Sequence, residues 1–427
     1  MIIEFRVGNF LSFKEISTLS FVATSGKEHQ SDNVVKISSN LSLLKSAAVY
    51  GANGSGKSNL IHALNFMQKY VAKSSSHSSK SIVAKNTFRL SASTIDEPSF
   101  FEITFWFKNR KFRYGFEIKD GLIVTEWFFH TPKTKEVTLF TREGKKLEFG
   151  ASFKEAKDNK GIEKNLKPNK LFLSLIGSVS ELDTPSDLAL QWFHMRLDVV
   201  NGADLEHNLD LTMHYLEDHP EGGYREKFAE LLRTLDIFDD FRLDETSTFQ
   251  LYPERRSGGL KTDELFSNHQ HQNVLIKRTV YDKNGKPKGT ADFDLIKDES
   301  EGTIKLFAFA GAVFGALDYG STLVVDELEL KLHPLITQTI IQLFNSKQTN
   351  RKKAQLLFTT HDTNLLTSKL FRRDQIWFTN KDRQCASSLY SLVEYKPRAE
   401  ATFEKDYLLG RYKGIPFIGN INELMGK

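Results

Sequence analysis

Apolar and polar residues alternate along much of the first third of the chain, which is the spacing of half-buried β-strands. Two such runs, 101–107 and 112–118, flank the polar tetrapeptide Lys108 to Lys111 and predict a β-hairpin. The alternation continues to about Phe149. This part of the chain is therefore expected to form an antiparallel β subdomain, with one face of its strands turned toward a core.

Helical spacing marks three other stretches. After Ser58, apolar residues recur at offsets of four, three and four, and similar patterns run from Asp187 to Asp240 and again after Thr303. A second hairpin is predicted between Val274 and Leu295, around a polar turn. The sequence contains no heptad array, so long coiled-coil arms are not expected.

Together these patterns predict a mixed α/β fold in four segments. We expect residues 1–73 and 299–427 to combine into one core around a central sheet, residues 74–175 to form a β-rich subdomain, and residues 176–298 to form a helical lobe with a hairpin. With 427 residues, the chain is long enough for two or three such parts, each with its own core.

A phosphate-binding loop is predicted where the apolar run Ala47 to Tyr50 meets the first helical stretch. Residues Gly51 to Ser58 match the pattern G-x-x-x-x-G-K-[ST] in the required position between a strand and a helix. Glycines let backbone N–H groups turn toward phosphate oxygens, the lysine reaches the β- and γ-phosphates, and the serine hydroxyl can ligate Mg²⁺. The candidate ATP ligands are Asn53, Gly54, Ser55, Gly56, Lys57 and Ser58.

A second apolar strand, Thr322 to Val325, ends in Asp326 and Glu327. One carboxylate can hold Mg²⁺ while the next polarises the attacking water, so we assign Asp326 to the metal and Glu327 to the general base. Taken alone, a strand that ends in Asp-Glu is more often the start of an ordinary loop. The assignment therefore depends on the other motifs.

Two weaker motifs flank these carboxylates. Ser300 and Gly302 precede an apolar helix, where a hydroxyl and backbone N–H groups can face a phosphate bound by another subunit. His361 follows a buried strand and could contact the γ-phosphate. Each feature alone fits an ordinary helix cap or a surface histidine. Their order, with Ser300 about 26 residues before Asp326 and His361 about 35 residues after it, makes coincidence implausible.

Composition restricts the remaining classes. Apolar residues (40%) and charged residues (26%) are near the averages for globular proteins, which disfavours a disordered or fibrous chain. The single cysteine, Cys385, excludes a disulfide framework and fits a reducing compartment. The sequence shows neither a secretion signal nor an apolar stretch long enough for a bilayer, so a cytoplasmic protein without a membrane span is expected. A net charge of +4 permits nucleic-acid contact without indicating it.

The order of the motifs resembles that of ABC-class ATPases, in which Walker A, signature, Walker B and switch histidine follow one another. The opening stretch Val7 to Phe13 resembles RecF- and SMC-like members, and Leu332 to Pro334 resembles the OLD-like branch with its altered D-loop. His333 stands where many ABC transporters have aspartate. The resemblance implies an ABC ATPase head that uses ATP and Mg²⁺ and pairs with a second copy, whose Ser300 and Gly302 complete the site in trans.

The C-terminal stretches Arg372 to Phe378 and Tyr407 to Ile418 resemble the ATPase subunits of abortive-infection and PARIS-type (AriA-like) phage-defence systems. This resemblance implies a sensor or scaffold that acts as a homodimer or higher homo-oligomer. Such ATPases are commonly paired with a separate effector, often a Toprim-like nuclease, and a phage-encoded trigger would fit the same scheme. No acidic Toprim constellation follows His361 in this sequence.

Two alternatives stay open. A RecF-like repair ATPase would bind DNA, and the basic clusters 108–113, 277–278 and 351–353 could contact its phosphates, although a solvated surface explains each cluster better. A protein that binds ATP but hardly hydrolyses it is also compatible with these motifs.

Overall fold

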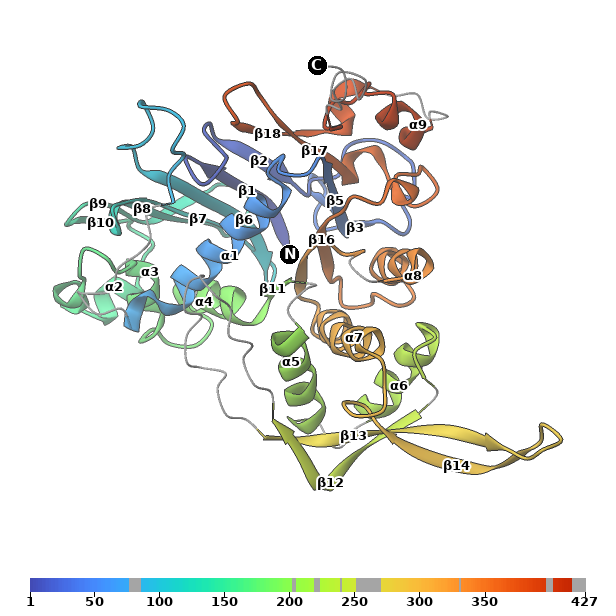
Figure 1. The fold of residues 1–427 in the computed structure, drawn as a ribbon. Coiled ribbons are helices and arrows are strands. Elements are labelled where there is room, and N and C mark those ends of the chain that lie inside the picture. The colour runs from blue at the N-terminus through green and yellow to red at the C-terminus, as the bar shows by residue number, and fades with distance from the viewer. Residues whose placement is uncertain are drawn as a thin grey trace, which may run out of the picture. The chain divides into compact units, whose positions relative to one another are not determined.

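The computed structural model describes residues 1–76, 86–201, 205–218, 223–238, 240–250, 270–329, 332–396 and 402–416. The chain divides into two compact units. The first unit comprises Met1–Val199, Gly320–Asp326 and Phe344–Lys427, and the second comprises Val200–Tyr319 and Glu327–Leu343. Figure 1 labels most of the helices and strands of both units.

The larger sheet of the first unit has seven strands in the order β10-β9-β8-β7-β6-β1-β2, and all neighbours pair antiparallel. Its strands are β1 (Ile2–Gly8), β2 (Ser17–Ser20), β6 (Ser99–Phe107), β7 (Arg110–Lys119), β8 (Leu122–Thr131), β9 (Val137–Glu143) and β10 (Lys146–Phe149). Lys108 and Asn109 form the predicted turn with φ angles of 43° and 59°, the left-handed conformation that suits a two-residue hairpin. The expected antiparallel β subdomain is confirmed, and the N-terminal strands β1 and β2 extend its sheet.

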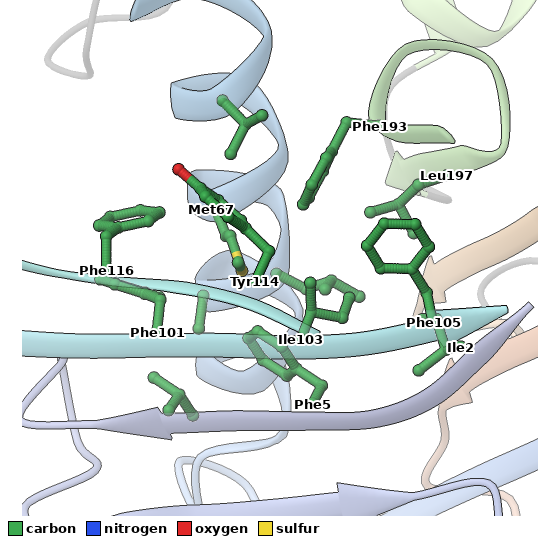
Figure 2. Close-up of a cluster of buried hydrophobic side chains, with 14 of the residues drawn as sticks. Ile2, Phe5, Met67, Phe101, Ile103, Phe105, Tyr114, Phe116, Phe193 and Leu197 are labelled. Carbon is green, nitrogen blue, oxygen red and sulfur yellow. The ribbon is translucent and has the colours of Figure 1, made fainter. Parts of the chain in front are cut away.

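Three helices cover this sheet: α1 (Lys57–Lys73), α3 (Phe172–Gly177) and α4 (Pro185–Met195). Figure 2 shows Met67 of α1 among Phe5, Ile103 and Tyr114 of the strands, and all four side chains are buried in one apolar cluster. Each fully buried side chain of this size contributes about 1.5–3 kcal/mol to folding. The helix that follows the glycine-rich loop is therefore fixed to a rigid sheet.

The second sheet of the first unit has the order β11-β15-β16-β5-β17-β18. Its strands are β11 (Leu197–Asn201), β15 (Thr322–Asp326), β16 (Gln355–Thr359), β5 (Ser46–Gly51), β17 (Ile376–Lys381) and β18 (Ser387–Ser391). Strands β15, β16, β5 and β17 are parallel to one another, whereas β18 is antiparallel to β17. β5 and β16 are buried along their whole length, as expected for the middle of a parallel sheet.

Smaller elements complete the first unit. Strands β3 (Val34–Lys36) and β4 (Ser42–Leu44) pair antiparallel, and α2 (Glu155–Asp158) and α9 (Phe403–Leu408) are short helices. The C-terminal stretch Tyr407 to Ile418 is described as far as residue 416, so Phe417 and Ile418 lie outside the described residues.

The second unit combines helices with a three-stranded antiparallel sheet in the order β12-β13-β14. Its strands are β12 (Asp240–Gln250), β13 (Gln270–Tyr281) and β14 (Pro287–Asp294), and its helices are α5 (Leu205–Asp218), α6 (Tyr224–Thr234), α7 (Glu301–Tyr319) and most of α8 (Pro334–Asn345). The hairpin predicted between Val274 and Leu295 is present as β13 and β14. β12 was not expected from the sequence.

The described part of the chain is thus a mixed α/β protein with a P-loop sheet, an antiparallel β subdomain and a helical lobe, and it contains no long coiled coil. The four segments expected from the sequence stay a prediction, since the division into two units follows other boundaries. Among the described helices, none is both long and apolar enough to cross a bilayer.

Candidate functional site

Three of the predicted motifs follow neighbouring parallel strands of the first unit. Val325 of β15 is paired with Phe358 of β16, and Thr359 of β16 is paired with Val49 of β5. Because the carboxyl ends of parallel strands meet at one edge of a sheet, Asp326, His361 and the loop after Gly51 belong to the same edge. That edge is the usual position of a ligand site in an open α/β sheet.

The loop from Gly51 to Ser58 is a tight turn between β5 and α1. Gly56, the residue before the helix, has a φ of 114°, and a Cβ there would collide with the Ser387 side chain. Gly54 also lies in the left-handed region, with a φ of 70°. These two positions need glycine because a side chain would be strained at both and would clash at Gly56. Asn53 and Gly54 are exposed at the tip of the loop.

Side chains from distant parts of the first unit hold this loop in place. The hydroxyl oxygens of Ser55 and Thr379 are 2.6 Å apart, and the Ser387 hydroxyl donates to the Ser55 carbonyl at 2.7 Å. The Ser387 hydroxyl oxygen accepts in turn from the Ser12 hydroxyl, 2.7 Å away, and Asn59 of α1 donates to the Ser12 oxygen at 2.6 Å. The loop is therefore preformed by a buried hydrogen-bond network that starts at the N-terminal Val7 to Phe13 stretch.

Lys57 is the first residue of α1 and is buried. Its Nζ donates to the carbonyl of Gly51 at 2.8 Å and to that of Ala52 at 3.2 Å, so the ammonium group lies inside the curve of the loop. The Nδ1 atom of His361 is 3.4 Å from the same Nζ. Ser58 follows in the first helical turn and is half-buried. The structure thus brings Lys57 and His361 together, as the order of the motifs predicts.

Asp326 ends β15, and one of its oxygens is fixed by a neighbouring strand. The hydroxyl of Thr359, at the end of β16, donates to Asp326 Oδ1 at 2.6 Å. Thr359 is fully buried, so this hydrogen bond sets the orientation of the carboxylate. Glu327 is the next residue and has a φ of 55°, a left-handed conformation that is rare for a residue with a long side chain. Strained backbone of this kind is concentrated at functional sites.

Ser300 and Gly302 lie at the amino end of α7, in the second unit. The Ser300 carbonyl accepts from the Ile304 N–H at 3.0 Å, and its hydroxyl accepts from the Thr303 N–H at 3.2 Å, which makes Ser300 the N-cap of the helix. Both Ser300 and Gly302 are exposed, and a Cβ at Gly302 would have only the Ser300 hydroxyl near it. This surface is open to an approaching molecule.

Two ion-paired residues support the segment before α7. Arg278 of β13 donates from Nε to Glu299 Oε1 at 3.0 Å, so the residue next to Ser300 is fixed to the sheet of the second unit.

His333, the predicted D-loop residue, also belongs to the second unit and is exposed. Its carbonyl accepts from the Ile336 N–H at 2.9 Å, which gives it a capping role at the start of α8.

Sequence reasoning missed five residues of this site: Ser12, Asn59, Thr359, Thr379 and Ser387. Ser12 lies in the Val7 to Phe13 stretch that carries the family resemblance, and Thr359 ends the strand that precedes His361, so local signals point to both. Ser387 follows β17 by a short turn and has no local motif around it. Its contact with the glycine-rich loop is visible only in the fold.

The comparisons with known proteins agree with a nucleotide-binding domain. A family model described as "AAA domain, putative AbiEii toxin, Type IV TA system" matches residues 46–367, about three quarters of the chain. No curated protein matches the sequence significantly.

Three solved structures of SMC heads are similar to the chain at low identity. An SMC head bound to the C-winged helix domain of ScpA is 14% identical, with 91% of this chain and 97% of that chain covered and a TM-score of 0.45. The SMC head domain from Thermotoga maritima is 13% identical, with 91% and 98% covered and a TM-score of 0.41. The Pyrococcus furiosus Smc head with an extended coiled coil, bound to the C-terminal domain of ScpA, is 12% identical, with 96% and 98% covered and a TM-score of 0.40.

Proposed function

The chain belongs to the family of AAA domains whose model matches residues 46–367, and on this premise we propose that it binds ATP with Mg²⁺ and hydrolyses it to ADP and phosphate. The observation that carries the proposal is the glycine-rich loop with Lys57 inside its curve and His361 beside it. A buried ammonium group surrounded by loop carbonyls can exchange those carbonyls for phosphate oxygens without moving its helix.

The roles of the remaining residues follow from their chemistry. Backbone N–H groups of Asn53 to Gly56 cradle the phosphates, while Lys57 neutralises the β- and γ-phosphates. The Ser58 hydroxyl and the Asp326 carboxylate are oxygen donors, the kind that Mg²⁺ prefers, so these two residues would hold the ion. When bound, the ion would neutralise charge that develops on the phosphate oxygens. Thr359 orients the Asp326 carboxylate.

Glu327 is proposed as the base that orients and polarises the attacking water, and His361 as the contact to the γ-phosphate. We further propose that Ser300 and Gly302 act on the nucleotide of a second copy. Their exposure at the amino end of a 19-residue helix supports this part of the proposal, because a hydroxyl and the positive end of the helix dipole suit a phosphate oxygen. His333 would then belong to the D-loop of the same dimer.

At the level of the cell, we propose that the ATPase acts as a sensor or scaffold in defence against phage and controls a separate effector, with a nuclease as the expected class. Two observations support this role. The family description names a toxin of a type IV toxin–antitoxin system. The stretches Arg372 to Phe378 and Tyr407 to Ile418 resemble those of phage-defence ATPases.

The alternative of a DNA-binding repair ATPase is less well supported, since several cations in two of the three candidate basic clusters have acidic partners. Lys108 is 2.6 Å from a carboxylate oxygen of Asp183, and Arg113 pairs with both Glu102 and Glu136. Lys277 and Arg278 pair with Asp240 and Glu299 in the same way. DNA binding is favoured when lysine and arginine side chains contact phosphates and release their counterions. Cations that already pair with carboxylates contribute less to this binding free energy.

The base assignment is tested by Glu327→Gln, which keeps the size of the side chain and removes its basicity. We expect ATP binding to be retained and turnover to fall by about two to four powers of ten. Glu329→Gln is the matched control, because it makes the same change two residues further along and should keep the parental rate. Parental turnover by Glu327→Gln would show that another group activates the water.

Completion of the site by a second copy is tested by mixing two inactive variants. Lys57→Ala removes the phosphate contact, and Ser300→Arg blocks the exposed helix terminus. If each site combines Lys57 of one copy with Ser300 of the other, a heterodimer of the two variants contains one intact site, so mixing should restore activity. Absence of any recovery across mixing ratios, with both variants folded and dimeric, would contradict a shared site.

A further inference from the structure

A cluster of metal-ligating side chains lies in the second unit, in residues to which the ATPase site gives no role. Asp210 and His214 come from α5, and His271 comes from β13. One carboxylate oxygen and one ring nitrogen from each histidine all lie within 4.8 Å of one another. A two-histidine, one-carboxylate set of this kind is a common ligand set for first-row transition metals.

The cluster follows from the fold of the second unit. Asp210 and His214 are four residues apart, so they share one face of α5, and Glu217 lies three residues further on the same face. β13 carries His271 against this face. The His271 Nε2 atom is 2.9 Å from Asp210 Oδ1, and the two imidazole ring centroids are 5.2 Å apart.

The second nitrogen of His271 has an acceptor that would orient the ring. His271 Nδ1 lies 3.3 Å from Glu217 Oε2, and a carboxylate on the far nitrogen is the usual way in which a metal-binding histidine is held. His214 Nδ1 lies 3.6 Å from Asp210 Oδ1 and 3.0 Å from the Asp210 carbonyl oxygen, so this nitrogen of His214 faces the cluster.

Burial also suits an ion. The side chains of His271 and Asp210 are 2% and 7% exposed, whereas that of His214 is 42% exposed. The cluster is therefore shielded on the side of β13 and open at His214, which supplies an entry path. A tetrahedral zinc ion needs about 3.3 Å between ligand atoms at its usual bond lengths, so His271 Nε2 and Asp210 Oδ1 would separate by only a few tenths of an ångström.

We propose that Asp210, His214 and His271 bind a divalent transition-metal ion, with Zn²⁺ as the ion that fits best, and that Glu217 positions His271. Imidazole nitrogens favour Zn²⁺ over Mg²⁺ and Ca²⁺, which prefer all-oxygen sites. The bound ion links α5 to β13. Because the Thr212 hydroxyl of α5 donates to the Ala308 carbonyl of α7 at 2.7 Å, an ion that holds α5 in place also stabilises its packing against α7, the helix that Ser300 caps.

The proposal is tested on the untagged full-length chain, without nucleotide, after removal of metal with a chelator. The chain is titrated with Co²⁺, whose visible spectrum reports the number and type of its ligands, and with Zn²⁺ in competition. We expect one ion per chain and a tetrahedral Co²⁺ spectrum that Zn²⁺ abolishes. His214→Ala is the main variant, since its half-exposed side chain can be removed without disturbing the core. It should weaken binding at least about tenfold.

Two further variants keep the test decisive if a histidine also matters for folding. Glu217→Gln keeps the size of the side chain but weakens its hold on His271, and it should weaken Co²⁺ binding by about 10–100-fold while the chain stays folded. His194→Ala removes an exposed histidine in the first unit and should leave binding unchanged. Stoichiometric binding that is equal in all variants, or no Co²⁺ spectrum in the folded parental chain, would overturn the proposal and leave the cluster as a hydrogen-bonded histidine of the core.

A stability measurement gives an independent readout. Zn²⁺ at about 100 times its dissociation constant should raise the melting temperature of the second unit by roughly 5–10 °C. His214→Ala should abolish that rise, and Mg²⁺ at the same concentration should not reproduce it. A rise that persists in His214→Ala would assign the stabilisation to another site.

Discussion

Two glycines one turn apart on α7 should respond in opposite ways to the same substitution. A Cβ at Gly311 would overlap the Thr212 side chain of α5, whereas a Cβ at Gly315 would meet no atom within 4 Å. Thr212 cannot move aside cheaply, because it is 1% exposed and its hydroxyl donates to Ala308. We therefore expect Gly311→Ala to force α5 and α7 apart and Gly315→Ala to be accommodated in place.

The magnitudes can be worked out for each position. Overpacking at Gly311 costs about 1–3 kcal/mol, and loss of the Thr212 hydrogen bond adds about 1 kcal/mol. The better helix propensity of alanine offsets about 1 kcal/mol of this, so the free energy of unfolding should fall by about 1–3 kcal/mol. Gly315→Ala has only the propensity gain and should raise the free energy of unfolding by about 0.5–1 kcal/mol.

Because of where the tryptophans lie, the unfolding of the first unit can be measured separately from that of the second. All four tryptophans, Trp106, Trp127, Trp192 and Trp377, belong to the first unit. Denaturation followed by tryptophan fluorescence therefore reports the first unit, while hydrogen exchange of α5 and α7 peptides reports the second. The substitutions should change exchange in α5 and α7 and leave the fluorescence midpoint nearly unchanged.

A double variant checks the physical reason. Thr212→Ala removes the hydroxyl and methyl groups that a Cβ at Gly311 would meet, so Gly311→Ala should cost less in that background than in the parental chain. Equal effects of alanine at 311 and 315, or the same cost of Gly311→Ala in both backgrounds, would refute the argument from close helix packing.

Two further predictions concern the first unit, and both are read from tryptophan fluorescence during denaturation. Burial is the main cause that lowers the pKa of His130 to about 4, and the nearby Arg110 is the second. The unfolded chain has a histidine pKa of about 6.5, so the folded state favours the neutral ring. The stability that results is fully present above pH 6.5 and is lost as the pH falls toward 4. His130→Phe should remove up to about 3 kcal/mol of this pH dependence, and an unchanged pH slope would count against His130 as its source. Arg372→Met should destabilise the first unit by about 3–5 kcal/mol, because it leaves Asp374 buried without its cation, and a loss below about 1 kcal/mol would show that the pair is dispensable.

The strand, loop and helix around Lys57 could be predicted because their signals are local. A short apolar run, a glycine-rich turn and a helical repeat are each set by residues that are neighbours in sequence. The hairpin at Lys108 and Asn109 was predictable for the same reason, since polar turn residues separate two alternating runs. β12 was missed in a stretch that shows helical spacing on its amino side.

Contacts between distant residues could not be read from local patterns. Ser12, Ser55 and Ser387 meet at the glycine-rich loop although more than 300 residues separate Ser55 from Ser387. His271 likewise reaches Asp210 only because β13 packs against α5. Serine and histidine are common surface residues, so nothing in their surroundings distinguishes these positions before the chain is folded. Arg372 belongs to a stretch that carries a family resemblance, but no local pattern predicts that it donates to the carbonyls of Gly26 and Glu28.

The position of β5 in its sheet has a consequence for how the protein is made. Its two neighbours, β16 and β17, lie between residues 355 and 381, so a ribosome must add roughly 300 more residues before either edge of this apolar strand can be paired. During that interval the strand is a template for unwanted association with other nascent chains. A fragment that stops before β16 would therefore contain the whole Gly51 to Ser58 stretch and still be expected to aggregate rather than bind a nucleotide.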